Sequence, residues 1–432
     1  MTAEIVIMNK EAIAFAADSA VTITEESGQK IFTSANKLFA LSKYHPVGIM
    51  VYGSALFMGV PWETVIKIYR KTLGKKRFDI LDGYVTDFIA FLENGNTLFP
   101  DLIQKQYLRN TVYSYLNYIK VSIASKIPFK FAESNEISEE EIEKIVSETI
   151  KEHLENWEKA ENIESIPKSF NEDIIIKYGK IINKAIEDVF ERLPISQSHS
   201  DQLKKIVASL FSKFPEGLQK EDVSGVVIAG FGEKDTFPVL ESCLVEGIVN
   251  NKLKYKRHIP DKVGFKISAL IIPFAQSEMV ETFMEGINPG LRNRMEGHLS
   301  EIFDKYPEVI AESIDKYNEG EKKILKKKLK EISNKIFKDY QEGVHDYREE
   351  NHVNPVIRVV SMLPKDELAA MAESLVNLTS FKRKVTMETE TVGGPIDVAV
   401  ISKGDGFVWI KRKHYFKAEQ NPQFFANYYM EV

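Results

Sequence analysis

The sequence is poor in cysteine, in long apolar runs and in excess positive charge. Its 432 residues include one cysteine, Cys243, which excludes an intramolecular disulfide and a metal site built from several thiolates. No stretch of about 18 uncharged apolar residues occurs, so we expect no membrane-spanning helix. A net charge of −6 argues against nucleic acid as the main partner, because phosphate binding requires a basic surface.

Several other patterns are weak or missing. The N-terminal segment contains Glu4 and Glu11 but no basic region, so we expect no signal peptide and a cytoplasmic location. The run 230–232 lacks the third glycine of a dinucleotide-binding loop, and the eight histidines show no metal-ligand spacing. Ser54 lacks the second glycine of a Gly-x-Ser-x-Gly elbow. We therefore expect neither a cofactor nor a metal site.

The composition is otherwise that of a globular protein, with 44% hydrophobic and 28% charged residues. Near the N-terminus, the apolar runs 5–8 and 12–17 flank the polar residues 9–11, which predicts a β-hairpin. A second pair of strands is expected at 31–41 and 47–52. Because these runs are almost continuously apolar, we expect a sheet that is buried on both faces.

Helical spacing dominates residues 73–220, where a capping box at 138–141 marks the start of one helix. Residues 131–165 hold twelve glutamates and three lysines. This indicates either an acidic docking face or, more simply, the solvated side of helices. The basic amphipathic run 322–330 allows a similar choice between contact with a membrane or acidic partner and an ordinary surface helix.

Strands return later in the chain and helices fill the intervals, with no fixed-period repeat. We expect the strands 236–245 and 265–272 to extend a sheet begun by 225–232. The remaining expected elements are helices at 277–345 and 365–379 and a hairpin formed by 396–401 and 406–410.

Thr2 is the first residue with distinctive chemistry. If Met1 is removed, Thr2 carries a free α-amine close to its own hydroxyl. An α-amine has a pKa of about 7.7–8.0 and can act as a base for that hydroxyl. Threonine is common at position 2, so the surroundings of Thr2 must supply the further evidence.

The predicted hairpin brings Asp18 to Thr2. With a three-residue loop at 9–11, paired positions sum to twenty, and Thr2 faces Asp18. A carboxylate at the end of an apolar run requires a cation, and Lys37, just before another apolar run, is the best candidate. A lysine here would favour the Thr2 alkoxide and lower the pKa of the amine. The alternative is a purely structural Asp18–Lys37 ion pair at a sheet end.

A set of segments occurs in order along the chain: Thr2, 15–19 (FAADS), 36–39 (NKLF), 48–53 (GIMVYG), 226–231 (VVIAGF) and 393–401 (GGPIDVAVI). Together they resemble the catalytic β-subunits of the proteasome, which are N-terminal nucleophile (Ntn) hydrolases. The resemblance covers about residues 1–72, 222–300 and 365–412.

This resemblance implies that Thr2 is the nucleophile and that Asp18 and Lys37 support it. It also implies an oxyanion donor, a backbone N–H at the end of the fourth strand. Strict spacing places this donor at Tyr52, whereas a shift of one residue places it at Gly53; a backbone N–H serves with either side chain.

Ser277 aligns with a serine that lies near the α-amine in the family, although its flanking glycines are missing here. The family's later Asp and Ser fall on Thr389 and Val392, so the groups that orient the amine depart from the family pattern.

The resemblance further implies an α+β fold, namely a four-layer αββα sandwich of two stacked antiparallel sheets with helices outside. We expect this domain to comprise residues 1–72, 222–300 and 351–432. Residues 73–221 and 301–350 are expected to form helical insertions.

Two functions are consistent with these features. The first is a threonine peptidase that cleaves amide bonds through an acyl-enzyme on Thr2. The second is a non-catalytic proteasome-like subunit that acts as a scaffold or binding module through its helical lobe. Expected partners are a peptide or protein substrate, further copies in an oligomer or ring, and a separate ATP-dependent unfoldase or other protein. Neither nucleic acid nor a membrane is an expected partner.

Overall fold

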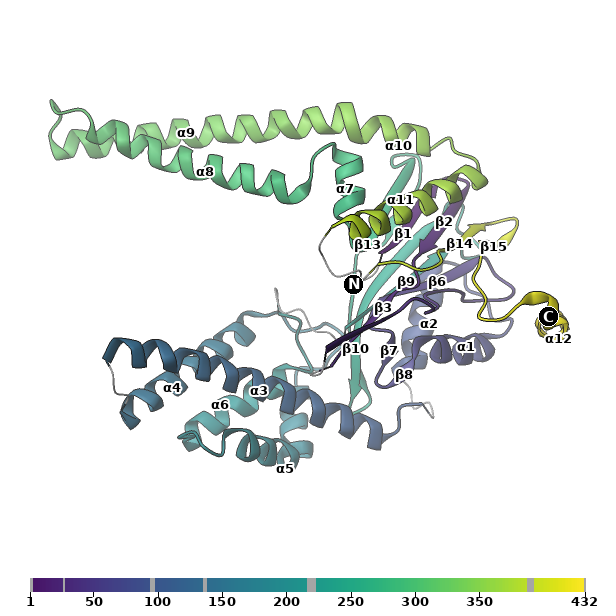
Figure 1. Cartoon of the computed structure of the whole chain (residues 1–432), viewed down its shortest axis with the longest axis horizontal. Coiled ribbons are helices and arrows are strands. Elements are labelled where there is room, and N and C mark those ends of the chain that lie inside the picture. Colours follow the sequence, from purple (N-terminus) through teal and green to yellow (C-terminus); the bar gives the residue numbers. More distant parts are fainter. Residues whose placement is uncertain are drawn as a thin grey trace. The chain divides into compact units, whose positions relative to one another are not determined.

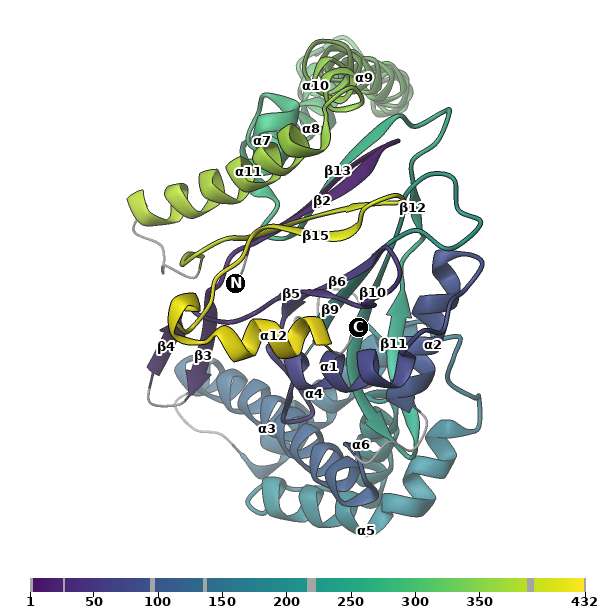
Figure 2. The same ribbon diagram turned by 90° about the vertical axis from the view of Figure 1, so that its right-hand side faces the viewer.

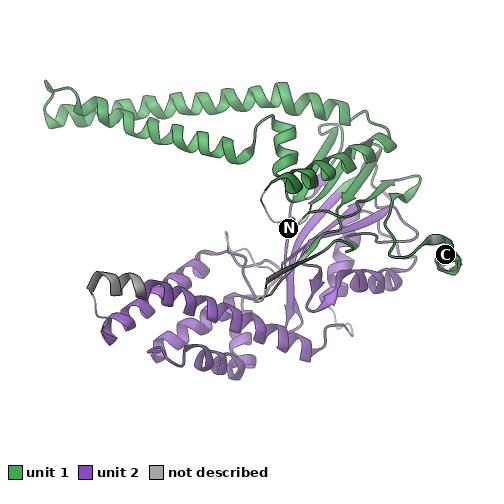
Figure 3. Ribbon diagram, in the orientation of Figure 1, with its two compact units in different colours: residues 1–38, 235–239, 262–432 green, residues 39–234, 240–261 purple. Residues whose placement is uncertain are grey.

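The structure is a computed structural model that describes residues 3–25, 28–93, 98–134, 138–215, 223–386 and 392–430. The chain divides into two compact units (Figure 3). Unit 1 comprises residues 1–38, 235–239 and 262–432, and unit 2 comprises residues 39–234 and 240–261. Residues from both ends of the sequence therefore build unit 1.

Unit 1 contains a five-stranded antiparallel sheet in the order β13-β1-β2-β14-β15. The N-terminal hairpin β1–β2 lies between strands contributed by the C-terminal half of the chain (Figure 2). The strands are β1 (Ala3–Asn9), β2 (Ala12–Ala17), β13 (Ala269–Ala275), β14 (Asp397–Ser402) and β15 (Gly406–Lys411). Both predicted hairpins of this unit, β1–β2 and β14–β15, are confirmed.

The predicted register of the first hairpin is wrong by one residue. Met8 pairs with Ile13, because the turn contains two residues rather than three. The side chain of Asn9 causes this: its Oδ1 accepts hydrogen bonds from the backbone N–H groups of Glu11 (2.9 Å) and Ala12 (3.1 Å). The predicted partner of Asp18, Thr2, lies outside the described residues.

The two faces of this sheet carry different side chains. Ile5 and Ile7 of β1 and Val398 of β14 pack with the helix α11 (Lys365–Val385), which begins at the predicted residue. The alternate residues of β1 and β2 point to the other face and are also buried. The prediction of burial on both faces is therefore confirmed for these strands.

The expectation that residues 265–272 extend the central sheet is wrong. The strand in this region, β13, pairs with β1 in a register that runs from Ala3 opposite Ala275 to Asn9 opposite Ala269. An apolar run indicates a strand, but it does not determine which neighbour that strand joins.

Helices occupy much of the rest of unit 1, as predicted for residues 277–345. The helices α8 and α9 run antiparallel as a long hairpin (Figure 1). The elements are β3 (Val21–Glu25), β4 (Gly28–Phe32), α7 (Glu278–Glu285), α8 (Pro289–Glu312), α9 (Glu319–Arg348), a π-helical turn η1 (Glu349–Val353), α10 (Asn354–Val360), a 3-10 turn η2 (Ala418–Gln420) and α12 (Pro422–Met430).

A second sheet, in the order β11-β10-β9-β6-β5, forms the centre of unit 2, with β12 beside β10. The helix α2 contacts β9 and β11. The elements are β5 (Leu38–Ala40), β6 (Val47–Gly53), β7 (Leu56–Phe57), β8 (Val60–Pro61), α1 (Trp62–Leu73), α2 (Leu81–Glu93), β9 (Ser224–Gly230), β10 (Val239–Val249), β11 (Lys252–Arg257) and β12 (Asp261–Lys262).

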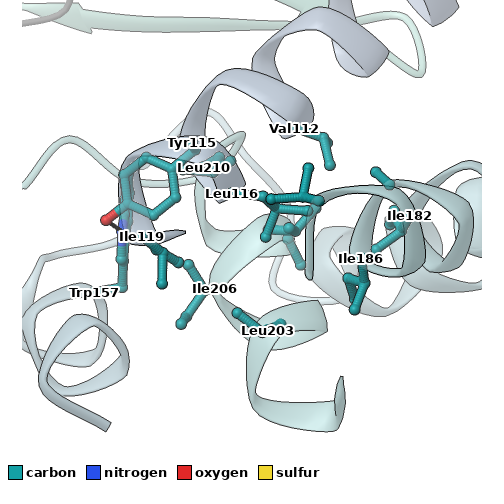
Figure 4. Packing of buried hydrophobic residues seen from close by; sticks show 14 of the residues in the cluster. Val112, Tyr115, Leu116, Ile119, Trp157, Ile182, Ile186, Leu203, Ile206 and Leu210 are labelled. Atoms are coloured by element: carbon teal, nitrogen blue, oxygen red, sulfur yellow. Dashed lines mark hydrogen bonds between the residues drawn. The ribbon is translucent and has the colours of Figure 1, made fainter. Parts of the chain in front are cut away.

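The predicted helical insertion of unit 2 folds around a core of its own (Figure 4). Its helices are α3 (Asp101–Ser134), α4 (Glu139–Lys159), α5 (Phe170–Phe190) and α6 (Gln197–Ser209). The predicted capping box at the start of α4 is confirmed, because Ser138 and Glu141 each bond the other's backbone N–H. We call α3–α6 the helical lobe.

The helices and antiparallel sheets of the two units agree with the predicted α+β class. Within the described ranges, no helix combines the length and hydrophobicity required to cross a bilayer.

Candidate active site

Two carboxylates stand at the same level of the unit 1 sheet. Ala17 of β2 pairs with Glu4 of β1 on one side and with Asp397 of β14 on the other. Paired residues point to the same face of a sheet, so Glu4 and Asp397 flank Ala17 on the face opposite α11. Both carboxylates are buried.

Asp18 and Lys37 complete the centre of this cluster. Lys37 lies in the segment before β5. A strand was expected over 31–41, but residues 33–37 do not form one. The Nζ of Lys37 forms an ion pair with Asp18 Oδ1. The same Nζ lies 3.1 Å from Glu4 Oε1. The side chains of Asp18 and Glu4 are fully buried and that of Lys37 is 6% exposed. The predicted pairing of Asp18 with Lys37 is therefore present, with Glu4 as a second carboxylate.

The backbone also holds Asp18. Its Oδ1 accepts a hydrogen bond from Ala3 N (3.2 Å), and its Oδ2 accepts from Gly393 N (2.9 Å) and Ala20 N (3.3 Å). These donors and the Lys37 ammonium replace the water that a carboxylate loses on burial. Asp18 consequently connects the start of β1 to the Gly393-Gly394 turn.

This turn requires glycine. Gly394 has φ +80°, and a Cβ at this position would lie 2.8 Å from the carbonyl oxygen of Thr33. Ser19 fastens the turn on its other side, because its backbone N donates to Gly393 O at 3.1 Å and its hydroxyl donates to Pro395 O. Gly394 is thus needed for the turn that brings Gly393 N to Asp18.

A second ion pair lies beside the first. Lys413 Nζ is 2.5 Å from Asp397 Oδ2, and the backbone N of Lys413 donates to Asp397 Oδ1 at 2.8 Å. Burial lowers the pKa of Lys413, and the charge of Lys37 lowers it further, whereas Asp397 and Asp18 oppose this shift. We call Glu4, Asp18, Lys37, Asp397 and Lys413 the charge cluster.

The remaining candidate residues lie in different places. Thr2 and Thr389 are outside the described residues. Ser277 lies two residues beyond Ala275, which pairs with Ala3, so it stands near the start of β1 as the first residue before α7. Val392 is fully buried in the apolar core beneath α11.

Gly53 belongs to unit 2, at the end of β6. Its φ is +80°, and an added Cβ would lie 2.6 Å from the carbonyl oxygen of Val223, so the backbone itself requires glycine here. Its role as an oxyanion donor, like that of Tyr52, stays a prediction.

Sequence reasoning missed Glu4, Asp397 and Lys413. Glu4 and Asp397 did leave a signal, because each is a lone carboxylate within an apolar strand, where it requires a partner. Lys413 follows β15 in a stretch with Lys411 and Arg412, and nothing in that stretch distinguishes it.

Two other groups with nucleophile chemistry are unsuitable. Burial raises the pKa of the Cys243 thiol to about 12, which keeps it protonated. Ser147 Oγ lies 2.8 Å from His199 Nε2, but His199 Nδ1 accepts a hydrogen bond from Ser196 N. The proton of His199 is therefore on Nε2, so the ring donates to Ser147 and is not a base for it.

Comparison of the chain with protein-family models, with curated proteins and with solved structures finds no match.

Proposed function

We propose that the protein is a threonine-type Ntn hydrolase that cleaves amide bonds in peptides or proteins through an acyl-enzyme on Thr2. The observation that carries this proposal is the position of Lys37 between Asp18 and Glu4, with Ala3 hydrogen-bonded to the same Asp18. Ala3 directly follows Thr2 in the sequence, and this adjacency links the cluster to the proposed nucleophile.

The reaction begins after removal of Met1. The free α-amine of Thr2, directly or through a water, accepts the hydroxyl proton as Oγ attacks the carbonyl carbon of the substrate amide. The C–N bond breaks, the amine returns the proton to the leaving amino group, and an ester remains on Thr2. A water then gives a proton to the α-amine and attacks the ester, which releases the acid product and restores the hydroxyl.

The charge cluster supports this chemistry in two ways. Lys37 favours the alkoxide of Thr2 and disfavours protonation of the α-amine, while Asp18 and Glu4 hold the lysine in place. The resemblance further assigns the role of oxyanion donor to Gly53 or Tyr52 and a place near the amine to Ser277.

One observation favours a second function, a non-catalytic subunit that binds partners through the helical lobe. Val392 occupies a position where the resemblance expects a serine, and it is buried among apolar side chains. A site that lacks a polar group at this position has lost part of the shell that orients the amine.

The intact mass of the purified chain distinguishes the two functions. The hydrolase requires the loss of one methionine residue, and a retained Met1 contradicts it. Thr2→Ala should abolish turnover of fluorogenic peptides and covalent labelling by a threonine-reactive electrophile, whereas Thr2→Ser should keep part of both.

Thr72→Ala is the matched control, because Thr72 is an exposed threonine on α1. It should leave turnover and labelling unchanged. Labelling that persists in Thr2→Ala shows that Thr2 is not the nucleophile.

A further inference from the structure

The hairpin formed by α8 and α9 buries very few residues for its length. In these two fully described helices, of 24 and 30 residues, only Pro307, Ala311 and Ser333 are buried. The helices meet along a stripe where Ser333 Oγ donates to Phe303 O at 2.6 Å and the rings of Phe303 and Phe337 lie 5.5 Å apart. Helices gain most of their stability from packing, and this pair has little of it.

One broad side of the hairpin carries ion pairs between the helices. Lys326 pairs with Glu308, and Lys330 Nζ lies 3.2 Å from Asp304 Oδ1. On α8, Asp304 follows the contact residue Phe303 by one position. On α9, Lys326 and Lys330 directly follow Leu325 and Leu329, two half-buried residues on the contact stripe. Residues one position after the contact stripe therefore lie together on this side.

The opposite side is mostly apolar, with the exposed Lys328 as a charged residue between Ile324 and Ile332 on α9. Antiparallel helices turn in opposite senses when viewed from one end, so residues one position before the contact stripe also lie together, away from the ion pairs. On α9, Ile332 precedes Ser333, and on α8, Ile302 precedes Phe303. The residues at such positions include Ile302, Tyr306 and Val309 on α8 and Ile324, Ile332 and Ile336 on α9, which are 42% to 65% exposed. We call these six residues the apolar face.

The pattern fits a four-helix bundle of which this chain supplies two helices. On each helix, one apolar stripe faces the other helix of the hairpin and a second apolar stripe lies beside it. A helix with two helical neighbours requires this arrangement. Six large side chains, each about half exposed, present on the order of 600 Å² of surface, close to the roughly 800 Å² that each partner contributes to a standard interface. A hairpin of equal length is the occupant that matches this face.

Charge favours the same hairpin from another copy. The helix α8 has five acidic and three basic side chains, whereas α9 has nine basic and six acidic ones. Packing α8 of one copy on α9 of the other therefore joins opposite net charges, and a two-fold interface closes on itself. Lys326 and Lys330 of the basic run pair with acidic residues on the far side, which argues against an anionic membrane as the occupant.

We propose that the apolar face docks on the same face of a second copy of this chain, so that two hairpins form an antiparallel four-helix bundle. This dimer does not depend on the proposed hydrolase, since none of its contacts involves the charge cluster.

Sedimentation equilibrium of the full chain tests the proposal. We expect a mass twice that of the 49.3 kDa chain and at least 100-fold weaker association in the variant Ile332→Asp/Ile336→Asp. The matched control Asn334→Asp/Gln341→Asp adds the same two negative charges to α9 at exposed residues on the ion-pair side, so it should weaken association far less than Ile332→Asp/Ile336→Asp does. Circular dichroism establishes that each variant is folded.

Cross-linking gives a readout that does not require disruptive substitutions. Phe303 and Ser333 lie at the same level of the hairpin. A mixture of Ile302→Cys and Ile332→Cys chains should therefore form a covalent dimer with a short bis-maleimide, and Asn334→Cys chains should not.

Three results overturn the proposal: a monomer at concentrations of about 100 μM, a dimer that Ile332→Asp/Ile336→Asp leaves intact, or binding of the monomer to vesicles with anionic lipid that this variant abolishes. The hydrolase fails separately, by retention of Met1 or by labelling of Thr2→Ala.

Discussion

Lys37 in unit 1 and Lys254 in unit 2 are both buried lysines held by carboxylates, but their surroundings differ. Lys254 Nζ lies 2.6 Å from Glu246 Oε2, donates to Leu210 O at 2.6 Å and stands 4.3 Å from the ring centroid of Phe214. Lys37 lies between two carboxylates, with the Asp397–Lys413 pair as a neighbour.

The difference indicates what each lysine does. Lys254 of β11 binds one carboxylate on β10 and the carbonyl at the end of α6, so it joins the helical lobe to the sheet of its own unit. The charge cluster gathers more carboxylates than lysines at the start of β1. Burying several charges together is unfavourable for stability. The pKa of Lys413 in this cluster is lowered by burial, and perturbed pKa values concentrate at functional sites.

The largest expected difference comes from removing each lysine. Lys37→Met and Lys254→Met should each lower the free energy of unfolding by about 3–5 kcal/mol, because a buried carboxylate loses its partner. Only Lys37→Met should also lower kcat/KM per folded molecule, by about 10³-fold or more. Urea unfolding and peptide hydrolysis measure the two effects, and equal losses of activity in both variants would contradict the comparison.

Removing a carboxylate together with its lysine sharpens the comparison. Lys254→Met/Glu246→Gln should recover about 2 kcal/mol relative to Lys254→Met, because it removes the carboxylate that the first substitution left without its lysine. Lys37→Met/Glu4→Gln should recover about 1 kcal/mol or less, because Asp18 remains without its ammonium partner. Urea midpoints of the four variants give these recoveries, and equal recoveries would show that the two sites are built alike.

The turn behind Asp18 has a smaller expected effect. Gly394→Ala forces a residue with a Cβ into a positive φ and toward Thr33 O, at a cost of about 1–3 kcal/mol. It should also reduce peptide hydrolysis about tenfold, since Gly393 N would shift from Asp18. Gly404→Ala is the control, because no atom lies within 4 Å of the added Cβ, and it should change the unfolding free energy by less than about 0.5 kcal/mol.

The smallest expected effect concerns a neutral buried arrangement in unit 2. Trp157 Nε1 donates to Tyr115 Oη at 2.6 Å, and Tyr115 Oη lies 3.1 Å from His153 Nδ1. Burial lowers the pKa of His153. As the pH falls below about 6.5, the unfolded chain binds this proton first, so stability decreases until the folded pKa is reached.

Thermal unfolding at pH 7.5 and pH 5.5 measures this loss, which should be about 1 kcal/mol and absent in His153→Gln. An identical pH dependence in the variant would show that His153 does not contribute to acid sensitivity.

Much of the fold could be predicted from the sequence, because apolar periodicity and caps are local. The hairpin at 396–410, the helix from Lys365 and the capping box at Ser138 follow from such patterns. The pairing of β13 with β1 could not be predicted, because the residues that meet there are 260 positions apart in the sequence (Asn9 and Ala269) to 272 positions apart (Ala3 and Ala275).

The site shows the same limit. Asp18 and Lys37 could be paired from the sequence, because a carboxylate ending an apolar run requires a cation. The side chain of Asn9, however, shortens the turn by one residue, and a shift of one residue changes every pairing in a hairpin. Glu4 and Lys413 enter the cluster only through long-range pairing, which the local pattern does not contain.

The strand order of the unit 1 sheet also has a consequence for biosynthesis. The hairpin β1–β2 leaves the ribosome before its neighbours β13 and β14, which are translated only after residues 268 and 396. At about 5–20 residues per second, the flank of β1 stays open for roughly 13–50 s and that of β2 for roughly 20–80 s. In the proposed enzyme, an aminopeptidase thus has ample time to trim the nascent chain before the sheet closes around its first strand.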